Sequence, residues 1–85
     1  MKINYKYIHF VSATLVDNAW YCLNNKSGYQ LGIVEYYPKW KQYVFTPDTD
    51  TCFSVDCLSD IINFISQLKP LDKYLDKKLK IKIRE

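Results

Sequence analysis

Apolar and polar residues alternate along the first half of the chain with the two-residue period of β-strands. Four runs show this alternation: Lys2–Val11, Ala19–Asn24, Tyr29–Tyr37 and Trp40–Thr46. The stretches between them are short and contain the Asn, Asp, Gly and Pro residues that favour turns. Short connections join strands that are neighbours in the sheet, so the pattern predicts an antiparallel meander.

Three features refine this expectation. In the first run, Tyr5, Tyr7 and His9 fall on one face of the strand. Gly32 lies inside the third run, where a glycine indicates a bulge or a close approach of another backbone. Pro38 cannot donate a hydrogen bond to a neighbouring strand, so it marks the corner between the third and fourth runs.

After residue 54 the apolar period changes to that of an α-helix. The expected apolar stripe consists of Leu58, Ile61, Ile62, Ile65 and Leu68. Either Ser54 or Asp56 suits the N-cap, and Pro70 ends the helical pattern. The sequence therefore predicts a helix over residues 55–69 that covers one face of the sheet.

These elements predict one α+β domain: a four- or five-stranded antiparallel sheet with one amphipathic helix packed on one face. Residues 1–54 form the sheet, residues 55–69 the helix, and residues 70–85 a basic C-terminal extension. Within the extension, we expect a short helix over 71–77 and a strand over 79–84, where LKIKIR alternates. The 85 residues are close to the lower size limit for a domain that folds without help.

Charge is concentrated at the C-terminal end. The formal net charge is +3, and Lys69–Arg84 holds seven of the twelve lysine and arginine residues. Such a segment is either a solvated surface or an attractor of phosphate groups. No apolar run approaches the roughly 18 residues of a membrane span, which predicts no membrane association. Three cysteines without framework spacing favour a reducing compartment, so we expect the protein in the cytoplasm.

The chain carries no recognisable catalytic or metal-binding motif. Cys22, Cys52, Cys57 and His9 would complete a zinc set, but their spacing lacks the paired ligands of such sites. Nucleophilic catalysis by Cys57 would need His9 beside it, and nothing in the sequence brings them together. The sequence predicts a protein that is not an enzyme and has no metal or cofactor.

Residues 36–43, here called the aromatic–basic segment, are the strongest candidate for a binding site. Their rings suit base stacking, their lysines suit phosphate, and a glutamine can read a base edge. Tyr36 and Tyr37 fall on opposite faces of the third run, and a sheet also needs rings to fill its core. Trp and Tyr also dominate protein interfaces, which is a third interpretation. The candidate ligand-binding residues are Tyr36, Tyr37, Lys39, Trp40, Lys41, Gln42, Tyr43 and Arg84.

Five segments of the chain carry a resemblance to a known family: Lys6–Phe10, Asn25–Gly28, Leu31–Tyr37, Trp40–Pro47 and Cys57–Leu68. They read KYIHF, NKSG, LGIVEYY, WKQYVFTP and CLSDIINFISQL. From residue 7 to about residue 68, the chain resembles a family of short proteins common in bacteriophage and prophage genomes. A tyrosine at position 36 replaces the usual tryptophan. A lysine at position 41 replaces the usual arginine, which removes the planar group for bidentate phosphate contacts.

The resemblance implies a small viral accessory protein of the kind that counters bacterial defence. The leading expectation is a protein that sequesters a nucleotide immune messenger. The alternative is a direct inhibitor of a host defence nuclease or effector, and the third is a single-stranded nucleic-acid binder. A small chain with aromatic-rich sheet faces also predicts a homo-oligomer, most simply a two-fold dimer.

Overall fold

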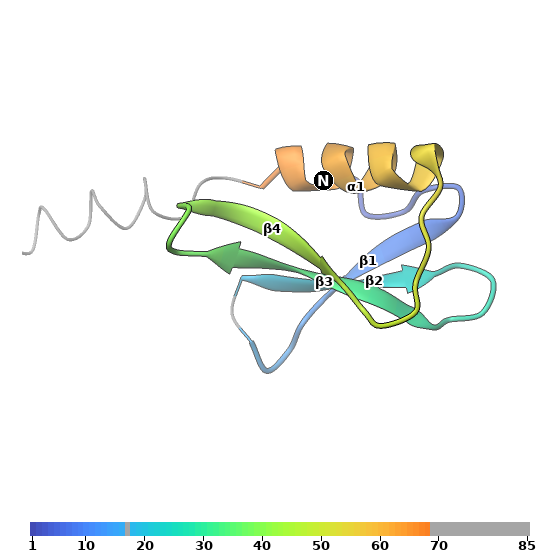
Figure 1. Cartoon of the computed structure of the whole chain (residues 1–85), viewed down its shortest axis with the longest axis horizontal. Helices are drawn as coiled ribbons and strands as arrows, with labels where there is room; N and C mark the ends of the chain where they lie inside the picture. The colour runs from blue at the N-terminus through green and yellow to red at the C-terminus, as the bar shows by residue number, and fades with distance from the viewer. Residues whose placement is uncertain (17, 69–85) are drawn as a thin grey trace, which may run out of the picture.

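The computed structural model describes residues 1–16 and 18–68. Four strands and one helix follow in order: β1 (Ile8–Ser12), β2 (Ala19–Asn24), β3 (Gln30–Tyr37), β4 (Gln42–Pro47) and α1 (Val55–Ser66). The strands form one antiparallel sheet in the order β1-β2-β3-β4, as Figure 1 shows. The predicted α+β meander is confirmed, with four strands in the described residues. The helix and strand expected over 71–77 and 79–84 lie outside them.

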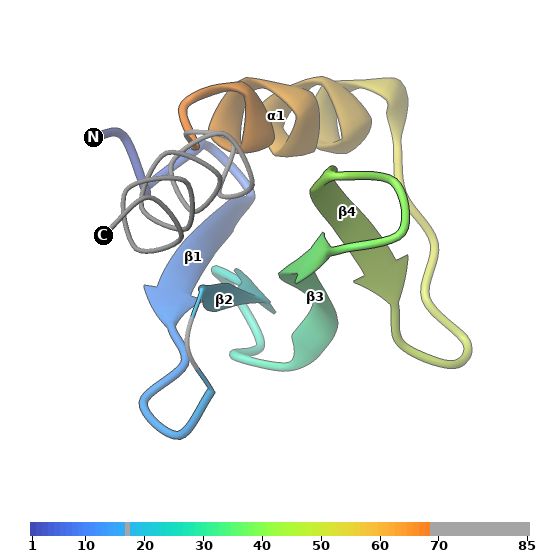
Figure 2. The ribbon, with the colours of Figure 1, turned by 90° about the vertical axis from the view of Figure 1, so that its left-hand side faces the viewer.

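The helix lies across one face of the sheet, and the core fills the space between the two layers (Figures 1 and 2). Directly paired residues of antiparallel strands lie on the same face, so the register places Phe10, Cys22 and Val34 on the helix side. The fully buried side chains of this core are Ile8, Phe10, Cys22, Val34 and Phe64. We call the other face, which no helix of the described residues covers, the open face.

The first predicted strand is wrong over its N-terminal half. β1 begins at Ile8, and the chain before it turns back so that Phe10 N–H donates to the Ile3 carbonyl at 2.9 Å. This turn separates Tyr5, which is buried, from Tyr7, which is exposed. The Tyr5 ring packs edge-on against Phe10, and its hydroxyl donates to Asn63 Oδ1 at 2.8 Å. Burial of this ring and its hydrogen bond to α1 override the simple alternation.

Gly32 accounts for both of the features expected of it. The register between β2 and β3 shifts between Cys22 and Leu23, so a bulge lies beside this position. A Cβ atom on Gly32 would stand 2.5 Å from Phe45 Cζ and 2.7 Å from the Thr46 carbonyl oxygen. Only glycine leaves room for the Phe45 ring to cross β3 at this point.

The predicted stripe of α1 is shifted around the helix. Ile61 is buried and Ile65 and Leu68 pack on the core, as expected, but Leu58 is exposed and Ile62 is 68% exposed. Phe64, which the predicted stripe omitted, takes the central place. Its ring stacks on Phe10 with centroids 3.9 Å apart and planes 3° from parallel. Several apolar residues lie outside the buried face, so the sequence alone does not show which stripe meets the sheet.

Both ends of α1 are held by side chains. Ser54 Oγ accepts from the Cys57 N–H at 3.2 Å, which confirms Ser54 as the N-cap. The helix ends at Ser66, three residues before the predicted end. The Gln67 side-chain amide there exchanges two 2.8 Å hydrogen bonds with the backbone of Lys2. The helix end is therefore tied to the N-terminal segment.

The shifted stripe gives a matched pair of stability variants. Phe64→Ala removes a fully buried ring and is expected to lower the free energy of unfolding by about 3–5 kcal/mol. Ile62→Ala, two positions away on the exposed side, is expected to change it by less than about 0.5 kcal/mol. Urea denaturation followed by circular dichroism measures both. Equal losses in the two variants would contradict the described orientation of α1.

Candidate functional site

The aromatic–basic segment spans the end of β3, a tight turn and the start of β4. Trp40 N–H donates to the Tyr37 carbonyl at 3.1 Å, and Lys41 N–H donates to the Pro38 carbonyl at 3.2 Å. Lys41 has a left-handed backbone with a φ of 55°. Because residues 38–41 form this turn, β4 begins at Gln42 and not at Trp40, and the corner expected at Pro38 is confirmed.

The turn divides the four rings of the segment between the two faces of the sheet. Tyr36 pairs directly with Tyr43 across β3 and β4, on the helix side, with ring centroids 5.3 Å apart. Tyr37, the next residue, points to the open face, where Trp40 packs edge-on against it at 4.9 Å. The sequence placed Tyr36 and Tyr37 on opposite faces, and this is confirmed. Tyr36, Trp40 and Tyr43 therefore do not form a single stacking surface.

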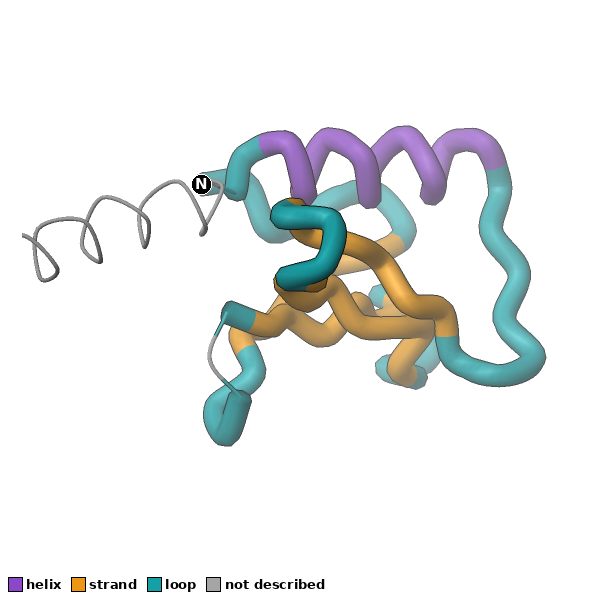
Figure 3. The backbone as a smooth tube through the Cα atoms, turned by 60° about the vertical axis from the view of Figure 1, so that its left-hand side comes forward, coloured by secondary structure: helices purple, strands orange, loops and turns teal. Residues whose placement is uncertain are grey.

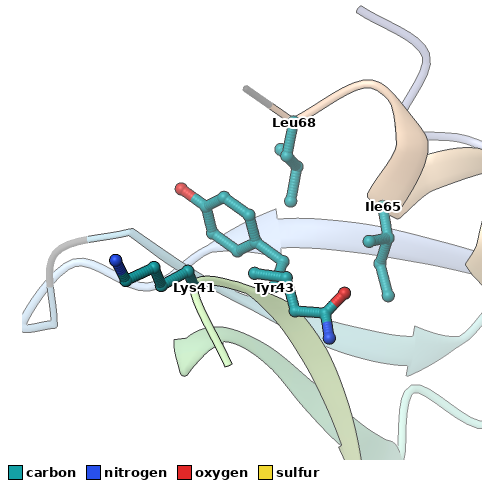
Figure 4. A pocket seen from close by; sticks show the side chains of 5 residues that line it. Lys41, Tyr43, Ile65 and Leu68 are labelled. Carbon is teal, nitrogen blue, oxygen red and sulfur yellow. The ribbon is translucent and has the colours of Figure 1, made fainter. Parts of the chain in front are cut away.

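A small cavity lies where the start of β4 meets the end of α1, and Figure 4 shows it closely. We call it the helix-side cavity; its volume is about 140 Å³ and it is lined by Lys41, Gln42, Tyr43, Ile65 and Leu68. Burial raises the pKa of the Tyr43 phenol. Three predicted site residues meet here, but the space is below the ~300 Å³ at which small-molecule sites usually begin.

A larger cavity of about 350 Å³ lies on the side of β4 that bears the Tyr37–Trp40 pair. We call it the sheet-edge cavity, and it is lined by Glu35, Tyr37, Trp40, Val44, Phe45, Thr46 and Pro47. Trp40 is 65% exposed at its rim. Glu35 is the charged residue of this lining, and no lysine or arginine of the described residues belongs to it. The cavity therefore presents rings and a carboxylate.

Of the predicted site residues that the structure describes, Tyr36 and Lys39 line neither cavity. Lys39 is exposed in the turn, and Arg84 lies outside the described residues. The sequence did not indicate Glu35 as a site residue, and it did not indicate that the helix residues Ile65 and Leu68 line a cavity. The two-residue period was the available signal for Glu35, because it places Glu35 on the same face as Tyr37.

The three cysteines and the histidine differ in burial and in the face on which they lie. Cys22 is fully buried, Cys57 packs against the core from α1, and Cys52 is exposed. His9 is paired with Leu23 on the open face, where its Nδ1–H donates to Asn25 Oδ1. Among residues 1–16 and 18–68, no group of three His, Cys, Asp or Glu side chains is placed to hold a metal ion.

Comparison of the chain with protein-family models, with curated proteins and with solved structures finds no match. The resemblance to short phage proteins therefore stays a prediction from the sequence. In the described part of the chain, no helix is both long and apolar enough to cross a membrane.

The buried cysteine predicts a pH-dependent term in stability. Burial, and secondarily the nearby Cys57 thiol, raises the pKa of Cys22 from 9.0 to about 12. Between these two pH values the folded protein keeps the Cys22 thiol proton, whereas the unfolded chain loses it. The stabilisation is therefore full below pH 9 and is lost as the pH rises toward 12.

Thiol labelling of the native protein at pH 8 checks this placement. Iodoacetamide is expected to modify the exposed Cys52 first and to leave Cys22 intact until urea unfolds the chain, because burial shields the thiol and keeps it protonated. Mass spectrometry of digested samples gives the rate at each site. The Cys52→Ser variant serves as the control that removes the fast phase. Modification of Cys22 at the rate of Cys52 in the folded protein would contradict the structure.

Proposed function

We propose that this chain is a non-enzymatic binding protein that docks on a partner protein through the aromatic pair of Tyr37 and Trp40. The observation that carries the proposal is the position of Trp40, which is 65% exposed yet held edge-on against Tyr37 beside a cavity. Tryptophan and tyrosine are the residues most often found at the energetic centre of protein interfaces. A ring held in place by its neighbour loses little freedom on binding, which supports such a role.

The resemblance to short phage proteins supports a bacterial defence nuclease or effector as the partner, bound in the cytoplasm of the host cell. Inhibition by docking needs a complementary surface and no chemistry of its own. The open face supports a two-fold dimer in addition, because Val11 and Tyr21 lie on it beside Ile33 and Val44 without a covering helix in the described residues. This assembly is part of the proposal.

Two features favour a protein partner over a nucleotide messenger. The rings of the aromatic–basic segment lie on two faces of the sheet, so one planar base cannot stack on all of them. The larger cavity carries the Glu35 carboxylate and no described cation, which opposes an anionic ligand. A protein interface needs neither an enclosed cavity nor a phosphate site.

The test is to purify the tagged chain from bacterial cells, identify the protein bound to it, and measure the affinity with both proteins pure. Trp40→Ala is expected to weaken binding about 30-fold, which corresponds to the ~2 kcal/mol of an interface hot spot. Tyr29→Ala is the matched control, because Tyr29 is also exposed, at 76%, but precedes β3 at the opposite end from Trp40. Unchanged affinity in Trp40→Ala, with the fold intact by circular dichroism, would refute the proposal.

A nucleotide messenger is the second candidate, favoured by the meeting of Lys41, Gln42 and Tyr43 at the helix-side cavity. Calorimetry against cyclic and linear nucleotide messengers tests it, and our proposal expects no heat of binding from any of them. Lys41→Asn is the informative variant, since asparagine tolerates the left-handed backbone and removes the charge. Micromolar binding that falls at least tenfold in Lys41→Asn would instead establish the messenger.

The same series covers the third candidate, a single-stranded nucleic acid, through short oligonucleotides at two salt concentrations. Its signature is an affinity that falls steeply as salt rises, because each neutralised phosphate releases a counterion. We expect no binding at either concentration.

A further inference from the structure

The two edges of the sheet differ in how their backbone is covered. At the β1 edge, the N-terminal segment lies alongside: Asn4 forms an isolated bridge with His9, and Phe10 N–H bonds to the Ile3 carbonyl. At the β4 edge, among residues 1–16 and 18–68, β3 alone bonds to the strand's backbone. Figure 2 shows the two edge strands at opposite margins, with α1 above them. Within the described residues, the outer side of β4 therefore presents N–H and C=O groups that no other strand pairs.

The sequence of β4 protects this edge at its last residue alone. Strands that must avoid pairing with other chains usually carry lysine, proline, an inward-pointing charge or a bulge. The six residues of β4 are Gln, Tyr, Val, Phe, Thr and Pro, none of them charged. The pairing with β3 runs without a register shift, and Pro47 stands at the strand's last position. Such a strand is suited to accept another strand.

The sheet-edge cavity extends around this edge. Its lining includes four consecutive residues, Val44–Pro47. Side chains alternate between faces along a strand, so a cavity confined to one face would contact every second residue. Contact with all four residues places the cavity beside the backbone of β4 as well as over the open face.

The residues that line the cavity indicate the charge of the group that it would bind. Glu35 is half-buried on the open face opposite Val44, and none of the described residues forms an ion pair with it. The rings of Tyr37 and Trp40 line the same cavity. A carboxylate attracts a cation directly, and the faces of aromatic rings attract it through their quadrupoles. The complementary group is a guanidinium or an ammonium.

We propose that the β4 edge accepts an extended segment of the partner protein as an added strand, and that the sheet-edge cavity receives an arginine or lysine side chain of that segment. Backbone hydrogen bonds along β4 supply affinity, and the cavity beside Glu35, Tyr37 and Trp40 selects the side chain. Arginine fits best, because its planar group both pairs with a carboxylate and stacks on rings. This inference rests on the proposed function and names its mode of recognition.

Three short peptides test the mode on the full chain. The probe is acetyl-Thr-Val-Arg-Val-Thr-amide, the charge control has glutamate in place of arginine, and the backbone control is the arginine peptide methylated on the amide nitrogens that face β4. Titrations followed by amide NMR signals are expected to show millimolar or tighter binding of the arginine peptide, with the shifts centred on Val44–Pro47. Both controls are expected to bind at least tenfold more weakly.

Variants of the chain complete the test. Glu35→Gln keeps the shape of the side chain and is expected to lower the affinity for the arginine peptide about tenfold. The affinity for the glutamate peptide is expected to stay the same or to rise slightly. Asp56→Asn is the matched control, since it removes one exposed carboxylate from α1 and is expected to change neither affinity. Three results would overturn the inference. These are no binding of the arginine peptide, binding no tighter than that of either control peptide, and an affinity that Glu35→Gln leaves unchanged.

Failure of this inference is distinguishable from failure of the proposed function. Suppose that Trp40→Ala lowers the affinity for the purified partner protein but the peptides show no preference for arginine. Docking on the open face then stands, and strand addition is refuted. If the arginine peptide binds as expected and the partner is indifferent to Trp40→Ala, strand addition stands and the Trp40 contact is refuted.

Discussion

The stack of Phe64 on Phe10 holds the two layers of this protein together. It joins the middle of α1 to the first strand, and Trp20 packs edge-on against Phe64 from the second. A four-stranded sheet of this size buries little on its own, so the sheet depends on the helix and the helix on the sheet. The position of this contact determines which side of α1 is buried. It also determines which face of the sheet is left open, and so where a binding surface is available.

The turn between β3 and β4 then decides what that surface contains. Because residues 38–41 bend with Lys41 in the left-handed region, β4 begins at Gln42 opposite Tyr37, and Tyr43 comes to lie opposite Tyr36. A turn one residue shorter or longer would move every β4 side chain to the other face. The present register sends two rings to the core side and leaves Tyr37 and Trp40 near Glu35. A local backbone geometry thus separates a core cluster from a candidate recognition surface.

The sequence predicted those parts of the structure that depend on local preference. β2 has the expected bounds, and the N-cap at Ser54 and the corner at Pro38 follow from residue chemistry. It failed where a distant contact competes with the local pattern. Tyr5 leaves its predicted strand because Phe10 and Asn63 bind it, and Phe64 displaces Leu58 and Ile62 from the buried side because its ring meets Phe10.

The candidate site was predictable in composition and not in arrangement. The rings and lysines of residues 36–43 stand out in the sequence, but their division between two cavities depends on strand pairing and on the helix end. Ile65 and Leu68 enter the helix-side cavity from more than twenty residues away along the chain. The sequence could not show that Glu35 lines the same cavity as the rings of Tyr37 and Trp40, because Trp40 reaches that cavity through the turn.

The link between Lys2 and Gln67 has a consequence for how the chain is made. The meander is built from neighbouring strands and can form while synthesis continues, but its core face stays bare until α1 and Gln67 have left the ribosome. The hydrogen bonds that close the fold join residues 65 positions apart in the chain, so they cannot form until Gln67 has been made. Completion of the fold therefore waits for the helix, and the nascent chain carries the uncovered ring of Phe10 from the synthesis of β1 until that of α1.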